Sequence, residues 1–326
     1  MGGAISTAAE LSEPLSEALI VRLASPRGFC AGVERAVRTV EEALATFGAP
    51  VFVRHEIVHN AHVVQRLKSM GAVFIEDIAD APPGRPLIFS AHGAPRAAFD
   101  EARARNIDPI DATCPLVHKV HHQIRRSVAR GRHVLMIGHK NHPEVIGAMG
   151  QAPSGSTTLI ETVDDAETFS PPPGALTYVT QTTLSLDDAA QITAVLKKRF
   201  PAIEAPRKSD ICYATQNRQE AARSISAGAD CVFVLGSAQS SNSNRLVETA
   251  LRAGAKSAVL VENPATFDLS VVAGAGAIGV TAGASTPECL VETLLTRIAE
   301  IRRIEIRTIE NTREDVFFKS PARLAG

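Results

Sequence analysis

The chain of 326 residues lacks several features that would assign it to a class at once. It has no Trp, two Tyr and only 4% aromatic residues, so we expect a core of Val, Leu, Ile and Ala. Lys and Arg number 34 against 35 Asp and Glu, which leaves no basic excess for binding nucleic acid or an anionic membrane surface. The apolar fraction of 45% excludes intrinsic disorder and suffices for about two or three domains.

Long hydrophobic runs are also missing. No stretch of about twenty apolar residues occurs, so we expect no transmembrane helix. The N-terminus has no basic start followed by an apolar block, so we expect no secretory signal and predict a cytoplasmic protein. Residues 1–17 are expected to form a mobile N-terminal extension.

The five cysteines include no CxxC pair. An odd number without an export signal argues against a disulfide framework. Cys231 lies in an apolar run typical of a buried strand, and Cys289 lies in a helical stretch where we expect it to pack as a small hydrophobic residue. The other three, Cys30, Cys114 and Cys212, each fall where a strand-like run or a loop gives way to an amphipathic helix.

These three cysteines are about equally spaced, so three lobes of similar size would each deliver one thiol. At a helix N-terminus the dipole favours the thiolate, which is the species that binds metal. Structural zinc usually takes four ligands in close pairs, which this chain lacks. Three thiolates suit a soft metal or an iron–sulfur cluster with one iron left without a protein thiolate. Spacing alone leaves open that they are three unrelated loop cysteines.

Short β-type runs alternate with helical repeats from end to end of the chain. Alternation of this kind predicts α/β units with largely parallel sheets. Strands are expected at 19–23, 51–53, 72–75, 87–89, 133–137, 176–179, 231–235, 258–261 and 277–280, and helices at 32–47, 61–70, 96–105, 115–130, 186–200, 215–227, 244–253 and 287–302.

Polar residues gather just after many of the strand candidates. Ligands of parallel sheets bind beyond the carboxyl ends of the strands, so several such ends would form one deep central site. His59 and His92 lie at two of these ends, and either ring suits a phosphate oxygen, protonated or donating from one nitrogen. Taken singly, each of these residues also fits the pattern of an ordinary histidine at the surface or at the edge of the core.

Two helix starts offer further donors for an anion. Ser240, Ser241 and Asn242 lie just before the helix expected from residue 244, and Ser285 lies before another helix. An ordinary N-cap explains any one of them, but two such starts with two histidines indicate an anion of diphosphate size. The chain has neither a G-x-x-x-x-G-K-[ST] nor a G-x-G-x-x-G motif after a strand, which excludes the common nucleotide sites.

The sequence His142-Pro143-Glu144 indicates acid–base chemistry. A carboxyl group in a closed pocket has a raised pKa and serves as a proton donor, and the proline fixes a helix start that would aim both neighbours. Thr182 offers a hydroxyl group for orienting a substrate alcohol. Three other histidines on the helix after Pro115 are expected to be solvated: His118, His121 and His122.

Nine segments, in this order, resemble the 4-hydroxy-3-methylbut-2-enyl diphosphate reductase (LytB/IspH) family of the non-mevalonate isoprenoid pathway. They extend over nearly the whole chain and are RGFCAGV (27–33), VRHEIVHN (53–60), FSAHG (89–93), DATCPLVHKVH (111–121), GHKNHPEVIGAMGQ (138–151), TQTTLS (180–185), RKSDICYATQNRQEA (207–221), GSAQSSNSNRL (236–246) and TAGASTPE (281–288). The resemblance implies a trefoil of three α/β lobes around a central cavity. We expect a strand at 18–31 that joins the third lobe, lobes at 32–114, 115–211 and 212–302, and a C-terminal tail at 303–326.

The resemblance also implies the chemistry. Cys30, Cys114 and Cys212 would hold a [4Fe–4S] cluster with one iron not ligated by cysteine and open to the substrate hydroxyl. Glu144 would deliver protons with help from His142 and Thr182. The products would be isopentenyl and dimethylallyl diphosphate, and the electron donor a ferredoxin or flavodoxin. The residues that would hold the allylic diphosphate are His59, His92, His142, Ser240, Ser241, Asn242 and Ser285.

Two other functions remain open. A non-redox dehydratase of the aconitase type also uses three thiolates and an open iron, but it needs no reductant. An iron–sulfur or zinc sensor would need a partner-binding surface, and it would leave Glu144 and the anion-binding residues unexplained.

Overall fold

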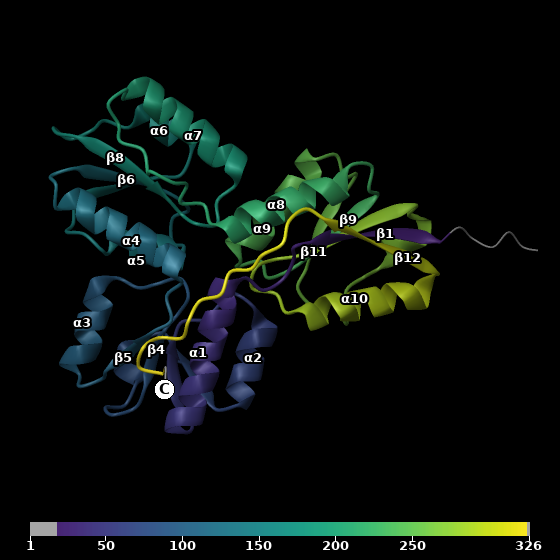
Figure 1. Cartoon of the computed structure of the whole chain (residues 1–326), viewed down its shortest axis with the longest axis horizontal. Helices are drawn as coiled ribbons and strands as arrows, with labels where there is room; N and C mark the ends of the chain where they lie inside the picture. Colours follow the sequence, from purple (N-terminus) through teal and green to yellow (C-terminus); the bar gives the residue numbers. More distant parts are fainter. Residues whose placement is uncertain (1–17, 325–326) are drawn as a thin grey trace, which may run out of the picture.

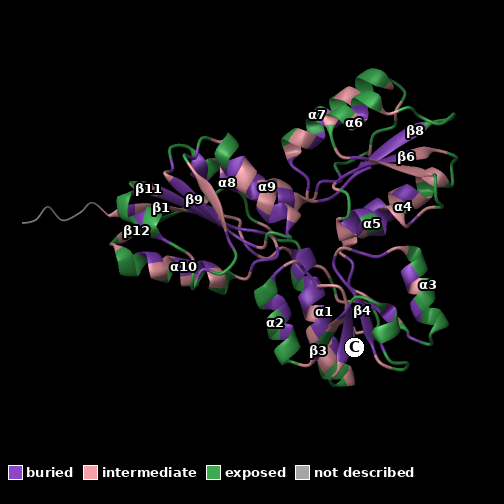
Figure 2. Cartoon of the chain, turned by 180° about the vertical axis from the view of Figure 1, so that it is seen from behind, coloured by how far each residue is buried: buried purple, intermediate pink, exposed green. Residues whose placement is uncertain are grey.

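Three α/β lobes meet at a central junction in the computed structural model of this chain, which describes residues 18–324 (Figure 1). Each lobe is built on one parallel sheet, and the sheets have four, three and five strands along the chain. Buried residues gather on the strands, and exposed residues lie on the outward faces of the helices (Figure 2). The predicted trefoil of α/β lobes is therefore confirmed. None of the helices between residues 18 and 324 is long and apolar enough to cross a membrane.

The first lobe has the four-stranded sheet, in the order β3-β2-β4-β5. Its strands are apolar on both faces, because Val53 and Ile88 contact one core cluster and Phe52 and Phe89 contact another. The elements are α1 (Ala31–Phe47), β2 (Val51–Arg54), α2 (Ala61–Ser69), β3 (Ala72–Ile75), the 3₁₀ helix Ile78–Asp80, β4 (Leu87–Phe89), α3 (Arg96–Ala104) and β5 (Pro109–Asp111).

The second lobe has the three-stranded sheet, in the order β7-β6-β8. Its central strand is also buried on both faces: Leu135 packs with α7 and Val134 packs with α4. These two helices therefore cover opposite faces of one sheet. The elements are α4 (Pro115–Val128), β6 (His133–Ile137), α5 (Pro143–Met149), β7 (Thr157–Ile160), α6 (Val163–Thr168), β8 (Leu176–Thr180) and α7 (Leu186–Arg199).

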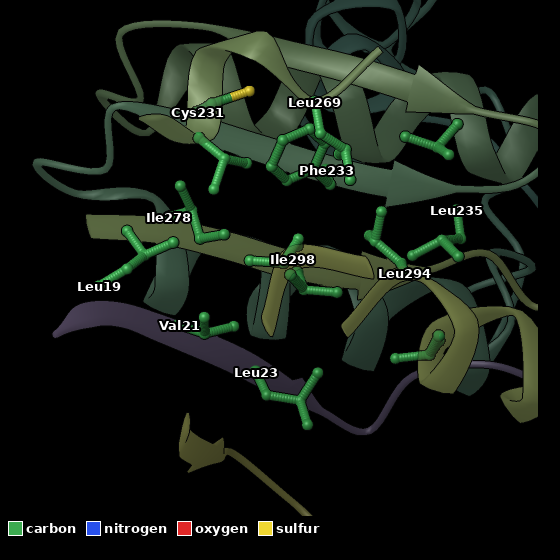
Figure 3. Packing of buried hydrophobic residues seen from close by; sticks show 14 of the residues in the cluster. Leu19, Val21, Leu23, Cys231, Phe233, Leu235, Leu269, Ile278, Leu294 and Ile298 are labelled. Carbon is green, nitrogen blue, oxygen red and sulfur yellow. The ribbon is translucent and has the colours of Figure 1, made fainter. Parts of the chain in front are cut away.

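The third lobe has the five-stranded sheet, in the order β10-β9-β11-β1-β12. Strand β1, from the start of the described chain, lies between β11 and β12 and pairs with both in parallel. Figure 3 shows its residues Leu19, Val21 and Leu23 in the same core as Leu294 and Ile298 of α10. Full burial stabilises each such side chain by about 1.5–3 kcal/mol. The elements are β1 (Leu19–Ser25), α8 (Tyr213–Ser226), β9 (Cys231–Leu235), α9 (Ser241–Arg252), β10 (Ala258–Val261), the 3₁₀ helix Ser270–Gly274, β11 (Ala277–Ala282), α10 (Glu288–Ile301) and β12 (Ile304–Glu310).

The C-terminal residues differ from the expectation. The tail expected at 303–326 begins instead with β12, which pairs with β1 along its whole length. This edge strand alternates Ile with charged residues and is largely exposed, so its sequence lacks the apolar run of a buried strand. The extension expected at residues 1–17 lies outside the described residues.

Four short elements are absent from the predicted ranges, and one helix start differs by three residues. The absent elements, β5, β7, α5 and α6, have three to seven residues each, too few to show a periodicity, although Pro143 indicates the start of α5. Helix α9 begins at Ser241, three residues before the predicted start, because Ser240 caps it.

Beyond β12 the chain crosses from the third lobe to the first and ends beside it (Figure 1). Arg35 and Arg38 of α1 donate hydrogen bonds to the carbonyls of Lys319 and Phe318, at 2.8 and 2.5 Å. Leu324 packs against the core of the first lobe. Residues 311–324, here called the C-terminal segment, therefore tie the two lobes together.

Candidate active site

One cavity at the junction of the lobes contains every side chain that the sequence singled out for chemistry. Its empty volume is about 700 Å³, and part of this space is open to solvent. The loops that follow six strands (β2, β4, β6, β8, β9 and β11) converge on it, as expected for the carboxyl ends of parallel strands. The twelve predicted residues that line it are Cys30, His59, His92, Cys114, His142, Glu144, Thr182, Cys212, Ser240, Ser241, Asn242 and Ser285.

Each of the three thiols belongs to the residue that caps the N-terminus of a helix. Cys30 caps α1 in the first lobe, Cys114 caps α4 in the second and Cys212 caps α8 in the third. All three are free. The predicted change from loop to helix at each cysteine is therefore confirmed, and the three helices direct their N-termini at one cavity.

Two residues that the sequence analysis did not single out support these sulfurs. A Cβ at Gly32 would lie only 2.6 Å from Sγ of Cys114, so glycine leaves room for that sulfur, and the same Cβ would be in ordinary contact with Sγ of Cys30 at 3.8 Å. The hydroxyl of Thr215 lies 3.2 Å from Sγ of Cys212, and its N–H donates to the same sulfur at 3.4 Å. Thr215 is the third helical residue after its cap, and that position was the available signal.

Two of the thiols, those of Cys114 and Cys212, carry a higher pKa than their helix positions suggest. Burial, together with the neighbouring Cys30, raises the pKa of the Cys114 thiol to about 12 and that of Cys212 to about 11. The N–H groups at the helix starts act in the opposite direction but are outweighed. The expectation of a thiolate is therefore wrong for Cys114 and Cys212 in the protein alone, because desolvation exceeds the effect of the helix dipole. A bound cation would reverse this balance, since a coordinating thiol is deprotonated.

The donor set fits an iron–sulfur cluster better than a single ion. Within residues 18–324, no group of three or more His, Cys, Asp or Glu side chains converges on a point that would hold one metal ion. A structural zinc site, which needs four ligands around one ion, is therefore not formed there. Thiolates around a cluster bind at separate corners and leave space between them for inorganic iron and sulfide. Three free thiols spread around one cavity meet that requirement.

Three imidazole rings form a cluster on another wall. His59 and His92 are stacked with centroids 4.2 Å apart, and His142 meets each of them edge-on at 5.8 Å. Burial, together with the imidazole neighbours, lowers the pKa of His92 well below its usual range and that of His142 to about 4. His92 and His142 are therefore neutral near pH 7 and offer N–H donors rather than charges.

The start of α9 forms a third wall. Ser240 caps the helix and accepts a hydrogen bond from the N–H of Ser243 at 3.3 Å, and Ser241 and Asn242 form the first turn. Oδ1 of Asn242 accepts from the N–H of Ala284 at 2.9 Å, which joins this turn to the loop after β11. Ser240, Ser241 and Asn242 all line the cavity, and the start of a helix offers free N–H groups to an anion. The hydroxyl of Ser241 donates to the carbonyl of Thr183 at 3.4 Å.

Two buried nitrogens on these walls have no partner. Nδ2 of Asn242 and Nε2 of His59 are buried without a hydrogen bond to any residue that the structure describes. The hydroxyl of Ser285 donates to the carbonyl of His59 at 3.1 Å, which fixes that histidine's backbone. An unmatched buried polar group costs about 1–3 kcal/mol, so this wall is suited to a polar ligand. Among residues 18–324, no Lys or Arg lines the cavity, so an anion would be held by neutral donors.

Glu144 is the buried acid of the cavity. It lies in the first turn of α5, and its carboxyl oxygens accept from the N–H of Thr182 at 2.6 Å and from the hydroxyl of Thr182 at 2.9 Å. Its own N–H donates to Nδ1 of His142, the cap of that helix, at 3.1 Å. Burial raises the pKa of Glu144 to about 7, against the two hydrogen bonds from Thr182. Near neutral pH this group therefore both holds and releases a proton.

Small apolar side chains complete the lining between the thiols and the histidines. They provide a surface for a short hydrocarbon group and no competing polar contact. They are Val33, Val58, Ala91, Leu116 and Val117.

The other singled-out residues lie away from the cavity. Cys231 is buried in β9, as predicted. Cys289 does not pack as a small hydrophobic residue: it is exposed at the start of α10, with Sγ 3.9 Å from Nε2 of His62. His121, expected to be solvated, is buried against Gly93, because α4 packs on the loop after β4.

The fold and this cavity define a class: a trefoil α/β protein with three converging thiols, a buried acid and an anion-binding wall. The family model described as "LytB protein" matches residues 21–299. A curated relative from Phenylobacterium zucineum, named 4-hydroxy-3-methylbut-2-enyl diphosphate reductase, is 54% identical over 96% of this chain and 100% of its own length. One of the same name from Hyphomonas neptunium is 53% identical over 94% and 98%. The chain belongs to the LytB protein family.

Solved structures agree with this assignment. The structure titled E-1-hydroxy-2-methyl-but-2-enyl-4-diphosphate reductase from Plasmodium falciparum superposes with a TM-score of 0.90 at 39% identity, over 94% of this chain and 97% of that one. A second, titled (E)-4-hydroxy-3-methyl-but-2-enyl diphosphate reductase, has a TM-score of 0.62 at 29% identity, over 87% and 100%.

Proposed function

We propose that this chain is a reductase of 4-hydroxy-3-methylbut-2-enyl diphosphate. The substrate takes up two electrons and two protons, its allylic C–O bond breaks, and the products are water and isopentenyl or dimethylallyl diphosphate. The observation that carries the proposal is that one cavity joins three free thiols, an acid with a pKa near 7 and an anion wall with unmatched donors. Membership of the LytB family supports it.

Cys30, Cys114 and Cys212 would hold the cofactor, a [4Fe–4S] cluster with one iron free of cysteine. When bound, such a cluster supplies a Lewis acid for the allylic oxygen and a store for electrons. Thr215 orients the third thiol through two contacts, and Gly32 keeps the space between the other two. Loading releases the thiol protons, because burial keeps Cys114 and Cys212 protonated before metal arrives.

The diphosphate would lie on the wall opposite the thiols. Asn242 Nδ2 and His59 Nε2, which lack partners, are the first donors we assign to it. Neutral His92 and His142 donate from one ring nitrogen each. The start of α9 adds backbone N–H groups and the hydroxyls of Ser240 and Ser241, with Ser285 beside them. Fixing the diphosphate in this way aims the hydrocarbon end at the thiols.

Glu144 would deliver the protons. Its carboxyl group is held by both hydrogen bonds from Thr182, so it presents one orientation to the cavity. His142 caps the helix on which Glu144 lies and also borders the anion wall, so it couples diphosphate binding to the acid. Thr182 would orient the substrate hydroxyl. The apolar lining would contact the hydrocarbon part of the substrate.

An aconitase-type dehydratase remains the second candidate, because it would use the same thiols. It needs no electrons, so dependence on a reductant separates the two. A sensor without catalysis has no use for a buried acid beside an anion wall. We also propose lobe boundaries of 32–114 and 115–211, with a third lobe that begins at 212 and includes β12. We further propose a cytoplasmic location and a ferredoxin or flavodoxin as donor.

The test is anaerobic purification with iron and sulfide counts, followed by an assay with the hydroxylated C5 diphosphate and reduced methyl viologen. We expect close to four irons per chain and release of both C5 products only when the reductant is present. Turnover without reductant would favour the dehydratase, and no turnover by cluster-loaded protein would exclude the reductase.

A further inference from the structure

A basic groove lies on the second lobe, outside the cavity. It runs between α4 and residues 204–208, which follow the edge of β8 through the bridge between Thr177 and Glu204. Its empty space is about 1000 Å³ and is open to solvent. The groove has one carboxylate, Glu204, which Arg132 pairs at 2.5 Å. Its cations are Lys119, Arg126, Arg130, Arg132, Arg207 and Lys208.

Four of these cations are not neutralised. Arg126, Arg130, Arg207 and Lys208 are exposed and make no ion pair with any carboxylate of residues 18–324. The whole chain has a net charge of −1, so this concentration of positive charge is local. A cluster of unpaired cations attracts an acidic partner and accelerates its association.

Each wall of the groove is close in sequence to a cysteine of the cavity. Helix α4 begins after Cys114, and Lys119 lies five residues further, roughly 7.5 Å along the axis. The other wall continues through residues 209–211 to Cys212. Lys119 joins the walls, because its Nζ donates to the carbonyls of Lys208 and Ser209, at 3.2 and 2.8 Å. It also contacts Oδ1 of buried Asp210, at 3.0 Å. The inner end of the groove is therefore the protein surface behind two of the three thiols.

We propose that this groove is the docking surface for an acidic protein that donates one electron at a time. This inference rests on the proposed function, which consumes two electrons per substrate. Two donor molecules dock in succession, and each is oxidised by one electron. The two electrons reduce the allylic carbon as its C–O bond breaks, and Glu144 supplies the protons. Docking on the thiol side leaves the histidine wall free for the substrate.

The lining of the groove argues against nucleic acid as the occupant. Proteins that bind single strands place aromatic side chains along the path for base stacking. Apart from His122, no aromatic ring of the described part of the chain, residues 18–324, lines this groove. Acidic side chains of a protein partner would instead meet Arg126 and Arg130 on one wall and Arg207 and Lys208 on the other.

The experiment compares two reductants on charge-reversed variants of the cluster-loaded protein. R126E/R130E changes the helix wall, and R207E/K208E changes the other wall. The matched control is K197E/K198E, which reverses two exposed lysines in the last turn of α7, on the opposite face of the same sheet. The probe is an acidic plant-type ferredoxin, and reduced methyl viologen is the small reductant that needs no docking.

We expect both groove variants to lose about tenfold or more in kcat/KM for reduced ferredoxin, and the control less than about twofold. Turnover with methyl viologen should stay within about twofold of wild type in all variants, with unchanged iron content. Calorimetric binding of oxidised ferredoxin should weaken in the same two variants. It should also weaken with added salt in the wild type.

Ferredoxin activity and binding that fall no further in the groove variants than in K197E/K198E would overturn the proposal. So would charge-dependent binding of a single-stranded RNA oligonucleotide with none of ferredoxin. If the wild type turned over with neither reductant, the proposed function would fail, and the ferredoxin binding data would still decide about the groove.

Discussion

Arg218 of α8 and Glu314 of the C-terminal segment form a buried ion pair, with Nη1 2.9 Å from Oε1. The same guanidinium donates to the carbonyls of Gly28 and Phe29, directly before Cys30. Arg218 also lies on the helix that Cys212 caps. One fully buried side chain thus links two thiol-bearing segments to the end of the chain.

Glu314→Ala should therefore destabilise the fold strongly. It leaves the Arg218 charge buried without its carboxylate, and breaking a buried pair costs about 3–5 kcal/mol. Urea unfolding of the cluster-free protein measures the loss. Glu220→Ala is the control, because its pair with Arg223 is exposed and is worth at most about 1 kcal/mol. Equal losses in the two variants would contradict the structural role of the pair.

Glu144→Gln should keep the cluster and lose the reaction. The amide keeps the shape of the carboxyl group but cannot act as an acid, so turnover should fall at least about a hundredfold. Iron content and the visible spectrum should match the wild type. In the wild type, turnover should fall as pH rises through about 7, because the carboxyl group loses its proton there. Near-normal turnover of the variant would remove Glu144 from this role.

Substitutions of the five cysteines should fall into two groups according to their effect on the bound iron and sulfide. Cys30→Ser, Cys114→Ser and Cys212→Ser should each lower the iron and sulfide bound per chain. Cys231→Ser and Cys289→Ser serve as controls, since one thiol is buried in β9 and the other is exposed on α10. Colorimetric iron and sulfide counts after anaerobic reconstitution decide this. A control variant that loses iron as a ligand variant does would contradict the assignment.

Diphosphate binding should take up protons. Burial lowers the pKa of His92 and His142 in the free protein, and a bound anion favours the protonated rings and raises both values. The bound state then holds more protons, so the affinity contributed by these rings rises as pH falls through their raised pKa in the bound state.

Calorimetry with inorganic diphosphate in two buffers of different ionisation enthalpy measures the uptake. His142→Gln should take up fewer protons than the wild type, and the titration of the ligand itself is common to both. His133→Gln is the control, because His133 bonds Thr158 on β7, away from the cavity. Equal uptake by wild type and His142→Gln would contradict the prediction.

Local sequence was sufficient for most of the helices, strands and caps. Cys30, Cys114 and Cys212 stand where an apolar run or loop meets a helical repeat, and each caps a helix. The histidines and serines after the strands line the cavity as the topology of parallel sheets requires. Their roles in binding and catalysis remain predictions. Strand β12 was missed because its pairing with β1 is a contact between the two ends of the described chain.

The order of strands and helices, and the residues at their ends, were determined by the sequence, because turns, caps and periodicity depend on near neighbours. Tertiary structure alone decided the environment of individual side chains. It buried His121, exposed Cys289, and placed Glu144 where its pKa rises to about 7. Burial and electrostatics depend on which lobes pack together, and that information is absent from any short stretch of the chain.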